Sequence, residues 1–168
     1  MTWMARAIST CGCGKPDLLA GNSWFKYRGG NRFDPIRVGS IGGRIRAGRF
    51  VRTSRTAQIV IAPGDGSGPL RFYECKGDPG KSESWVGHNL LDRDMIHGHT
   101  LDIGDVDGDG NLDIFAADMA KWTTKPGVDH LAATAWILYG DGDLDILNKQ
   151  YSWNAPRVGV WLNNGTKH

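Results

Sequence analysis

The most chemically distinctive stretch of the sequence is an alternation of carboxylates and glycines between Asp105 and Asp113. Asp105, Asp107 and Asp109 occupy positions 1, 3 and 5 of one short loop, where unscreened carboxylates would repel one another. Gly110 supplies the sharp turn that directs them toward one point, and hard oxygen ligands in this number select calcium over zinc. We therefore predict a calcium site. Its ligands would be the side chains of Asp105, Asp107, Asp109 and Asp113, the backbone carbonyl of Asn111, and water.

Two other interpretations of this loop compete with the calcium site. An EF-hand needs a bidentate Glu at position twelve, where this chain has Ala116, and it needs a helix where this chain has a β-type run from Asp113. The EF-hand is therefore excluded. A solvated acidic turn without metal is the remaining alternative. If an ion binds, a structural role is favoured over a catalytic one.

Two histidines directly before the acidic loop form a second candidate site. If His97 and His99 lie on a strand, their imidazoles face the same way and would converge on a second divalent metal or on a ligand. A third ligand would have to come from elsewhere, and His88, His130 and Asp102 are unranked candidates. The alternative is a pair of ordinary, partly buried histidines bonded to backbone carbonyls.

Two arginines and several tryptophans are candidates for ligand binding. Arg44 and Arg46 alternate around Ile45, so one face of a strand would present both guanidinium groups to an anionic sugar such as a uronate, or simply to solvent. Tryptophans at hairpin positions would stack on sugar rings or fill the space between sheets. These are Trp24, Trp122, Trp136, Trp153 and Trp161. The chain has no Gly-x-Ser-x-Gly nucleophile elbow, and its catalytic residues, if any, stay unknown.

The elements that would position these residues are short β-strands that recur along the chain. Each unit has an apolar run that begins with Asp or Gln, then a gap, then an aromatic-rich run, which together predict a hairpin. The four hairpins join 17–20 to 24–27, 58–62 to 70–73, 113–117 to 136–139, and 145–147 to 158–162. A further strand precedes two of the units, since 43–50 aligns with 99–106. The glycine-rich run 64–68 lacks the ending of a phosphate loop and is predicted to be a turn.

The spacing of these units favours an incomplete β-propeller. The first residues of the units lie at 17, 58, 113 and 145. The spacings between these positions bracket the roughly 40–50 residues of one four-stranded blade. An antiparallel sandwich is the alternative, but it does not require recurring residue identities. The last unit is short, so either the chain is a deletion of a longer parent or this blade lacks inner strands. Because an open arc leaves sheet edges unpaired, we expect self-association or a partner.

The acidic run Asp105–Ile114, together with the ending Val160–Thr166, resembles the FG-GAP or VCBS repeat of calcium-bound β-propellers. This resemblance implies a blade loop whose aspartates hold a structural ion. Two departures limit it to one full site. In the last unit Ile137 and Tyr139 occupy the first two acidic positions, and in the earlier repeat Arg49 stands where Asp105 would be.

A weaker resemblance concerns the Gly-His-x-Leu run that leads into the acidic loop. It is similar to that of propeller domains attached to carbohydrate lyases and aldos-2-ulose dehydratases, in which inner-strand residues face a central funnel. This resemblance implies an enzymatic alternative. In that alternative His97 and His99 would hold a divalent metal.

The composition agrees with a β-rich chain. The 24 glycines and 7 prolines among 168 residues favour turns over long helices, and 40 % hydrophobic residues suffice for a core.

The net charge of +2 is too balanced to indicate a nucleic-acid or membrane-surface partner, and no apolar run is long enough to span a membrane. The first ten residues lack the apolar run of a signal peptide. Cys11, Cys13 and Cys75 are odd in number and predict no disulfide framework.

We therefore expect an all-β chain in which a disordered tail, residues 1–14, precedes one incomplete β-propeller of three to four blades over residues 15–168. Its expected function is that of a calcium-stabilised module for binding or scaffolding, with a carbohydrate or protein ligand. An extracellular or periplasmic location is expected because free calcium is plentiful outside the cytoplasm. The alternative is the propeller portion of a carbohydrate lyase or dehydratase that uses a His-bound divalent metal.

Overall fold

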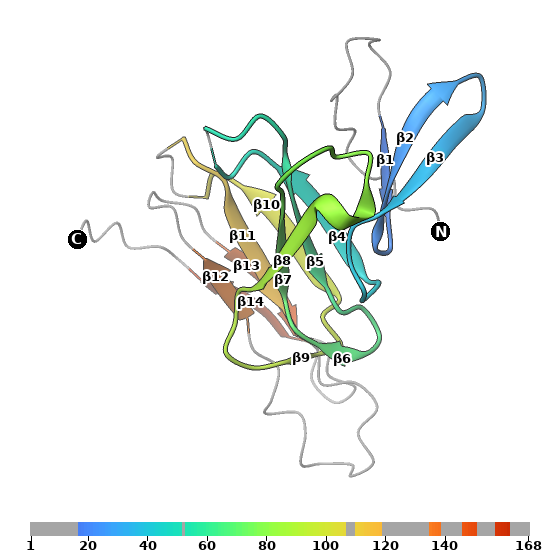
Figure 1. Cartoon of the computed structure of the whole chain (residues 1–168). Helices are drawn as coiled ribbons and strands as arrows, with labels where there is room; N and C mark the ends of the chain where they lie inside the picture. Colours follow the sequence, from blue (N-terminus) through green and yellow to red (C-terminus); the bar gives the residue numbers. More distant parts are fainter. Residues whose placement is uncertain are drawn as a thin grey trace.

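The computed structural model is all-β, and it describes residues 17–51, 53–106 and 110–118 together with the strands 135–138, 146–150 and 157–161. The predicted tail, 1–14, lies outside these residues. The strands form antiparallel sheets that follow one another along the chain (Figure 1). The first sheet contains β1 (Leu18–Ala20), β2 (Ser23–Gly29) and β3 (Arg32–Arg37), and the second contains β4 (Arg44–Gly48), β5 (Gln58–Ala62), β7 (Arg71–Cys75) and β8 (Trp85–Asn89).

The later sheets are smaller. The third contains β10 (Thr100–Gly104), β11 (Asp113–Ala117) and β12 (Ala135–Leu138), and the fourth pairs β13 (Ile146–Gln150) with β14 (Arg157–Trp161). A short ribbon pairs β6 (Ser67–Gly68) with β9 (Met95–Ile96), and one 3-10 turn, η1 (Ser82–Ser84), precedes β8. Within the described residues each large sheet has its strands in chain order, as in an up-and-down meander.

The four hairpins predicted from the sequence are confirmed as antiparallel pairs. They are β1–β2, β5–β7, β11–β12 and β13–β14. The two aligned strands that precede hairpins are also present, since β4 pairs with β5 and β10 pairs with β11. The registers match as well: Gly48 lies opposite Gln58 at one end of β4, and Gly104 lies opposite Asp113 at the equivalent end of β10.

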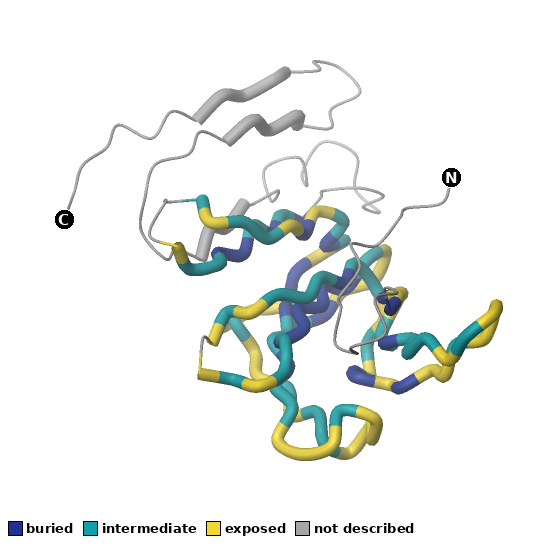
Figure 2. Tube along the Cα trace, turned by 90° about the horizontal axis from the view of Figure 1, so that it is seen from above, coloured by how far each residue is buried: buried dark blue, intermediate teal, exposed yellow. Residues whose placement is uncertain are grey.

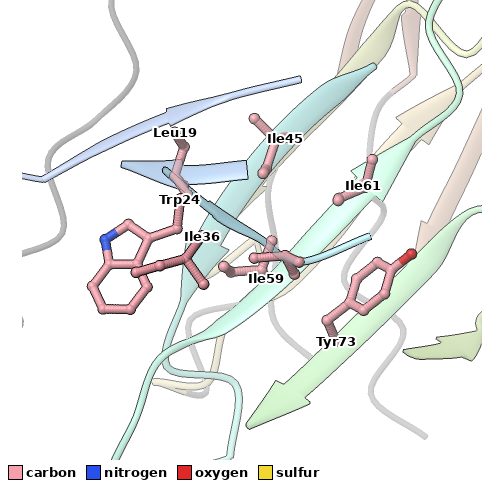
Figure 3. Close-up of a cluster of buried hydrophobic side chains, with 8 residues drawn as sticks. Leu19, Trp24, Ile36, Ile45, Ile59, Ile61 and Tyr73 are labelled. Carbon is pink, nitrogen blue, oxygen red and sulfur yellow. The ribbon is translucent and has the colours of Figure 1, made fainter. Parts of the chain in front are cut away.

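The core consists of two apolar layers on the two faces of β5. Every residue of β5 is buried, and alternate side chains point to opposite faces of a strand. Ile59 and Ile61 therefore belong to the layer shared with the first sheet, whereas Val60 and Ala62 belong to the layer shared with β10 and β11. Figure 3 shows the first layer, in which Leu19, Trp24 and Ile36 face side chains of the second sheet. The second sheet thus packs between its two neighbours.

The first strands of successive sheets lie beside one another. β4 contacts β1 on one side and β10 on the other, so equivalent strands are neighbours in space. Exposed residues concentrate at the hairpin ends and on the β2–β3 arm (Figure 2). The unpredicted strand β3 is an edge strand that contains Pro35, a residue that sheets tolerate mainly at edges. Among the described strands no sheet closes on itself.

Candidate functional site

The acidic loop joins β10 to β11, and Asp113 closes its far end. Asp113 is the first residue of β11 and is 1 % exposed. Its carboxylate oxygen Oδ2 accepts a hydrogen bond from the backbone N–H of Val106, at 2.6 Å. The loop is therefore folded back on the residue that begins the next strand. As predicted, this residue leads into a strand and not into a helix.

The near end of the loop is closed by Asp105. Its Oδ2 accepts a hydrogen bond from the backbone N–H of Gly110, at 2.9 Å. Gly110 has φ of +83°, a conformation that is strained for residues with a Cβ, so glycine is required at this turn. This hydrogen bond links positions 1 and 6 of the loop. The calcium-loop prediction includes such a sharp turn at Gly110.

The structure describes only part of the predicted ligand set. Asp105 is exposed, Asn111 is half-buried and Asp113 is buried, and Asp107 and Asp109 lie outside the described residues. The donor set present, two carboxylates and an asparagine on one hairpin, is chemically suited to a hard cation and not to a soft one. Calcium binding by this loop is therefore compatible with the geometry that the structure gives and stays a prediction.

The β4–β5 loop provides a neutral version of the same corner. Gln58 begins β5, is 1 % exposed, and accepts hydrogen bonds at Oε1 from the backbone N–H groups of Phe50 and Val51, at 2.9 and 3.0 Å. Its Nε2 donates to the carbonyl of Thr56, at 2.8 Å. A buried polar side chain at the first residue of the second strand therefore closes both corners. One of them contains an amide and the other a carboxylate.

The first unit uses its own buried aspartate in a related way. Asp17 immediately precedes β1, is 2 % exposed, and accepts a hydrogen bond at Oδ1 from the N–H of Tyr27, at 2.8 Å. The sequence shows that Asp or Gln recurs at the start of each unit. For the three of these residues that the structure describes, it adds the reason: each buried side chain accepts hydrogen bonds from backbone N–H groups.

The two predicted histidines come together in a turn and not on a strand. His97 follows β9, has φ of +51°, and donates its N–H to the carbonyl of Gly66, at 3.0 Å. The N–H of His99 donates to the carbonyl of His97, at 2.7 Å, and β10 begins one residue later. The strand alternation used to predict their convergence is therefore wrong, although the two rings do stack, with centroids 6.4 Å apart.

The third member of this cluster is Asp65, which lies in the glycine-rich run 64–68 that is predicted from the sequence to be a turn. A ligand atom of Asp65, one of His97 and one of His99 all lie within 4.8 Å of one another. Asp65 Oδ1 is 2.7 Å from His99 Nε2. The pairing of β6 with β9 brings the two segments together, because Ser67 lies opposite Ile96. A two-residue strand carries no periodicity, so the sequence gives no signal for this meeting.

The third ligands suggested by the sequence are elsewhere. His88 lies on β8 with Nε2 3.0 Å from the Glu74 carboxylate, and Asp102 accepts from Arg46. His130 lies outside the described residues. The hydrogen bond from Lys76 is the largest cause that lowers the pKa of Glu74 below its ordinary value, and His88 adds smaller contributions.

The two predicted ligand-binding arginines form hydrogen bonds with His99 and Asp102, at the start of β10. Arg44 Nε donates to the His99 carbonyl at 3.0 Å, and Arg46 Nε donates to Asp102 Oδ1 at 3.1 Å. Arg44 therefore links β4 to the residue just before β10, and Arg46 links β4 to β10 itself. Recognition of an anionic sugar by these side chains stays a prediction.

Among the five tryptophans considered for stacking, the structure describes the side chain of Trp24. Trp24 is 4 % exposed and makes an edge contact with Trp85, with ring centroids 6.4 Å apart. It fills the space between the first and second sheets, as the packing alternative predicts. The other four side chains, those of Trp122, Trp136, Trp153 and Trp161, lie outside the described residues.

Comparisons with known proteins give no relatives. No protein-family model, no curated protein and no solved structure matches this chain. In the part of the chain that the structure describes, no helix has the length and apolar character needed to cross a membrane.

Proposed function

We propose that this chain is a calcium-stabilised β-propeller repeat module of three to four blades, whose role is binding or scaffolding. Its ligand would be a carbohydrate or a protein, and its location extracellular or periplasmic.

The repeat architecture supports blades. Meander sheets follow one another in chain order, apolar layers join the first sheet to the second and the second to the third, and the first strands β1, β4 and β10 are neighbours. Successive blades around an axis have these features. The matched registers of the β4–β5 and β10–β11 pairs add a repeat at the level of single residues.

The observation that carries the calcium proposal is the closure of the acidic loop on Gly110. The hydrogen bond from Gly110 to Asp105 turns the segment back on itself, and the buried Asp113 fixes its other end. Carboxylates gathered in so short a loop repel one another unless a cation lies among them. An ion there would connect the ends of β10 and β11, and so stabilise the third sheet.

The experiment is thermal unfolding with calcium and with a chelator. A ligand that binds only the folded state raises the unfolding midpoint, so the wild-type midpoint should rise with calcium. Asp107→Asn should abolish most of this rise, because it removes a ligand charge. Asp92→Asn, on an exposed residue before β9, is the matched control and should keep the rise. An undiminished calcium effect in Asp107→Asn would reject the assignment.

Open edges support self-association. β3 and β8 are the outer strands of their sheets, and β8 carries the exposed Val86. Unpaired strand edges are templates for pairing with another chain. Sedimentation equilibrium should therefore show a dimer or larger species, and a strictly monomeric chain at high concentration would count against this part of the proposal.

The second candidate is an enzyme, the propeller portion of a carbohydrate lyase or dehydratase. The observation in its favour is the cluster of Asp65, His97 and His99, whose mixed nitrogen and oxygen ligands suit a catalytic metal. Turnover of an acidic polysaccharide or a keto-sugar that disappears on replacement of both histidines would favour this candidate over the binding module.

A further inference from the structure

We propose that Asp65, His97 and His99 bind one transition-type divalent ion such as Zn²⁺, with a coordination position left open to solvent. This site is separate from the acidic loop and does not depend on calcium. It is built from the turn before β6 and the turn after β9, which the pairing of those two strands holds together.

Two histidine ring nitrogens of this cluster are buried and form no hydrogen bond within the described part of the chain. His97 Nδ1 and His99 Nε2 are both shielded from solvent, and neither has a hydrogen-bond partner among the described residues. Buried polar atoms of folded proteins are nearly always hydrogen-bonded, so two ring nitrogens without a hydrogen bond in one turn need an explanation, although His99 Nε2 does contact the Asp65 carboxylate. A metal ion that accepts their lone pairs would satisfy both.

The carboxylate of Asp65 lies close to one of these nitrogens. His99 Nε2 lies 2.7 Å from Asp65 Oδ1, yet this nitrogen forms no aligned hydrogen bond in the structure. The two atoms are therefore close without an aligned hydrogen bond, and a small shift apart would let both bind one ion at the usual metal–ligand distances of about 2.0–2.2 Å. Two imidazoles and one carboxylate form a ligand set that suits zinc and similar transition ions better than calcium.

The backbone holds the turn in a conformation that only a few residues adopt. Among the described residues, His97 is the only non-glycine residue with a positive φ. Its N–H donates a hydrogen bond to the carbonyl of Gly66, which is next to Asp65 in the sequence. Gly98 packs so closely on Pro63 that an added Cβ would lie 2.9 Å from its Cδ. Strained backbone of this kind is retained where the surroundings hold a functional group in place.

The open position follows from ligand number and exposure. Three protein ligands leave a fourth tetrahedral position for water or for an oxygen of a bound molecule. The Asp65 side chain is 85 % exposed, whereas that of His99 is 24 % exposed, so the solvent lies on the Asp65 side. A hydroxyl or carboxylate oxygen of a ligand could reach the ion from there.

The test is zinc titration of the full chain against a chromophoric chelator, with Co²⁺ absorption as a second readout of nitrogen ligation. Thiolates also bind zinc, so Cys11, Cys13 and Cys75 are replaced by Ser in every sample. The parent protein should bind one equivalent. His97→Asn and His99→Asn should each weaken binding by roughly 100-fold or more, since loss even of an outer partner costs about 10–100-fold.

Asn is chosen at position 97 because it tolerates positive φ, so loss of binding will not reflect a refolded turn. Asp65→Asn, on an exposed side chain, should weaken zinc binding while leaving the unfolding midpoint in chelator unchanged. His88→Asn is the control for histidines outside the cluster and should bind zinc like the parent. Asp107→Asn should also bind zinc normally, which separates this site from the acidic loop.

Absence of zinc binding by the parent protein would overturn the proposal. So would a His88→Asn variant that loses as much affinity as His97→Asn, because the ligands would then lie elsewhere. A Co²⁺ complex without the intense absorption of a four- or five-coordinate ion would argue against the open tetrahedral arrangement.

Discussion

The corner between β4 and β5 and the corner between β10 and β11 occupy equivalent places in adjacent sheets but are closed by different chemistry. Gln58 closes the first with an amide, and Asp113 closes the second with a carboxylate; each is 1 % exposed. Both side chains accept hydrogen bonds from backbone N–H groups just past the end of the preceding strand. The shared element is thus a buried acceptor, and the charge is an addition to it.

The corners are also neighbours in space. The side chains of Leu112 and Ile103 fill the space beside Gly48, so the acidic loop packs on the last residue of β4. The two corners therefore share an environment and differ in the residues of their loops, Arg49 to Ala57 in one and Asp105 to Leu112 in the other. We infer that the fold needs the acceptor at both corners, whereas the proposed ion is needed only where carboxylates accumulate.

The largest effect is expected at the neutral corner. Gln58→Ala removes a buried side chain that accepts hydrogen bonds from two part-buried backbone donors, which should lower the free energy of unfolding by about 3 kcal/mol. Urea unfolding in calcium and in chelator measures it. The loss should be equal in both conditions, because no carboxylate of the corner is involved. A loss that depends on calcium would break the distinction between the corners.

The next effect is expected at the acidic corner and should depend on the ion. Asp113→Asn keeps an oxygen that can accept the Val106 N–H but removes a charge, so its stability in chelator should equal or exceed that of the wild type. With saturating calcium the wild type should be more stable by about 2 kcal/mol. The same unfolding assay tests both halves. Equal destabilisation in both conditions would mean that Asp113 acts only as an acceptor, like Gln58.

The turn at Gly110 should contribute less. Gly110→Ala forces a Cβ into φ of +83°, which should cost about 1–2 kcal/mol. Gly104→Ala, in the same hairpin and with no atom near the added Cβ, is the matched control and should be nearly neutral. Thermal unfolding compares them. If both substitutions cost the same, the strained turn would not be what positions Asp105.

The comparison of the corners also shows what the sequence can predict. Recurring apolar and aromatic runs locate the hairpins, and the alignment of 43–50 with 99–106 predicts β4 and β10 in the correct relation. These signals are local, and each strand is long enough to show them. Burial of Asp17, Gln58 and Asp113 is less visible, because polar residues are ordinarily exposed.

What the sequence could not predict depends on contacts between distant short segments. Asp65 meets His97 through β6 and β9, each only two residues long, and nothing in a glycine-rich turn marks one carboxylate as a ligand. Likewise, alternation at positions 44 and 46 predicts a shared face for two arginines but not that their partners would be His99, just before β10, and Asp102 on β10. Both outcomes depend on which distant segments the fold brings together, by pairing β6 with β9 in one case and by packing β4 against β10 in the other.

The smallest effect is expected from the ion pair that links the two sheets near the corners. Arg46 Nε lies 3.1 Å from Asp102 Oδ1, and the two side chains are 34 % and 71 % exposed. Solvent screens such a pair, so a double-mutant cycle with Arg46→Ala and Asp102→Ala should give a coupling energy of about 0.5 kcal/mol. The coupling should shrink further in 1 M salt. A coupling above about 2 kcal/mol would mean that the arginine helps to hold the corners together, and the independence of the Gln58 and Asp113 effects would then have to be abandoned.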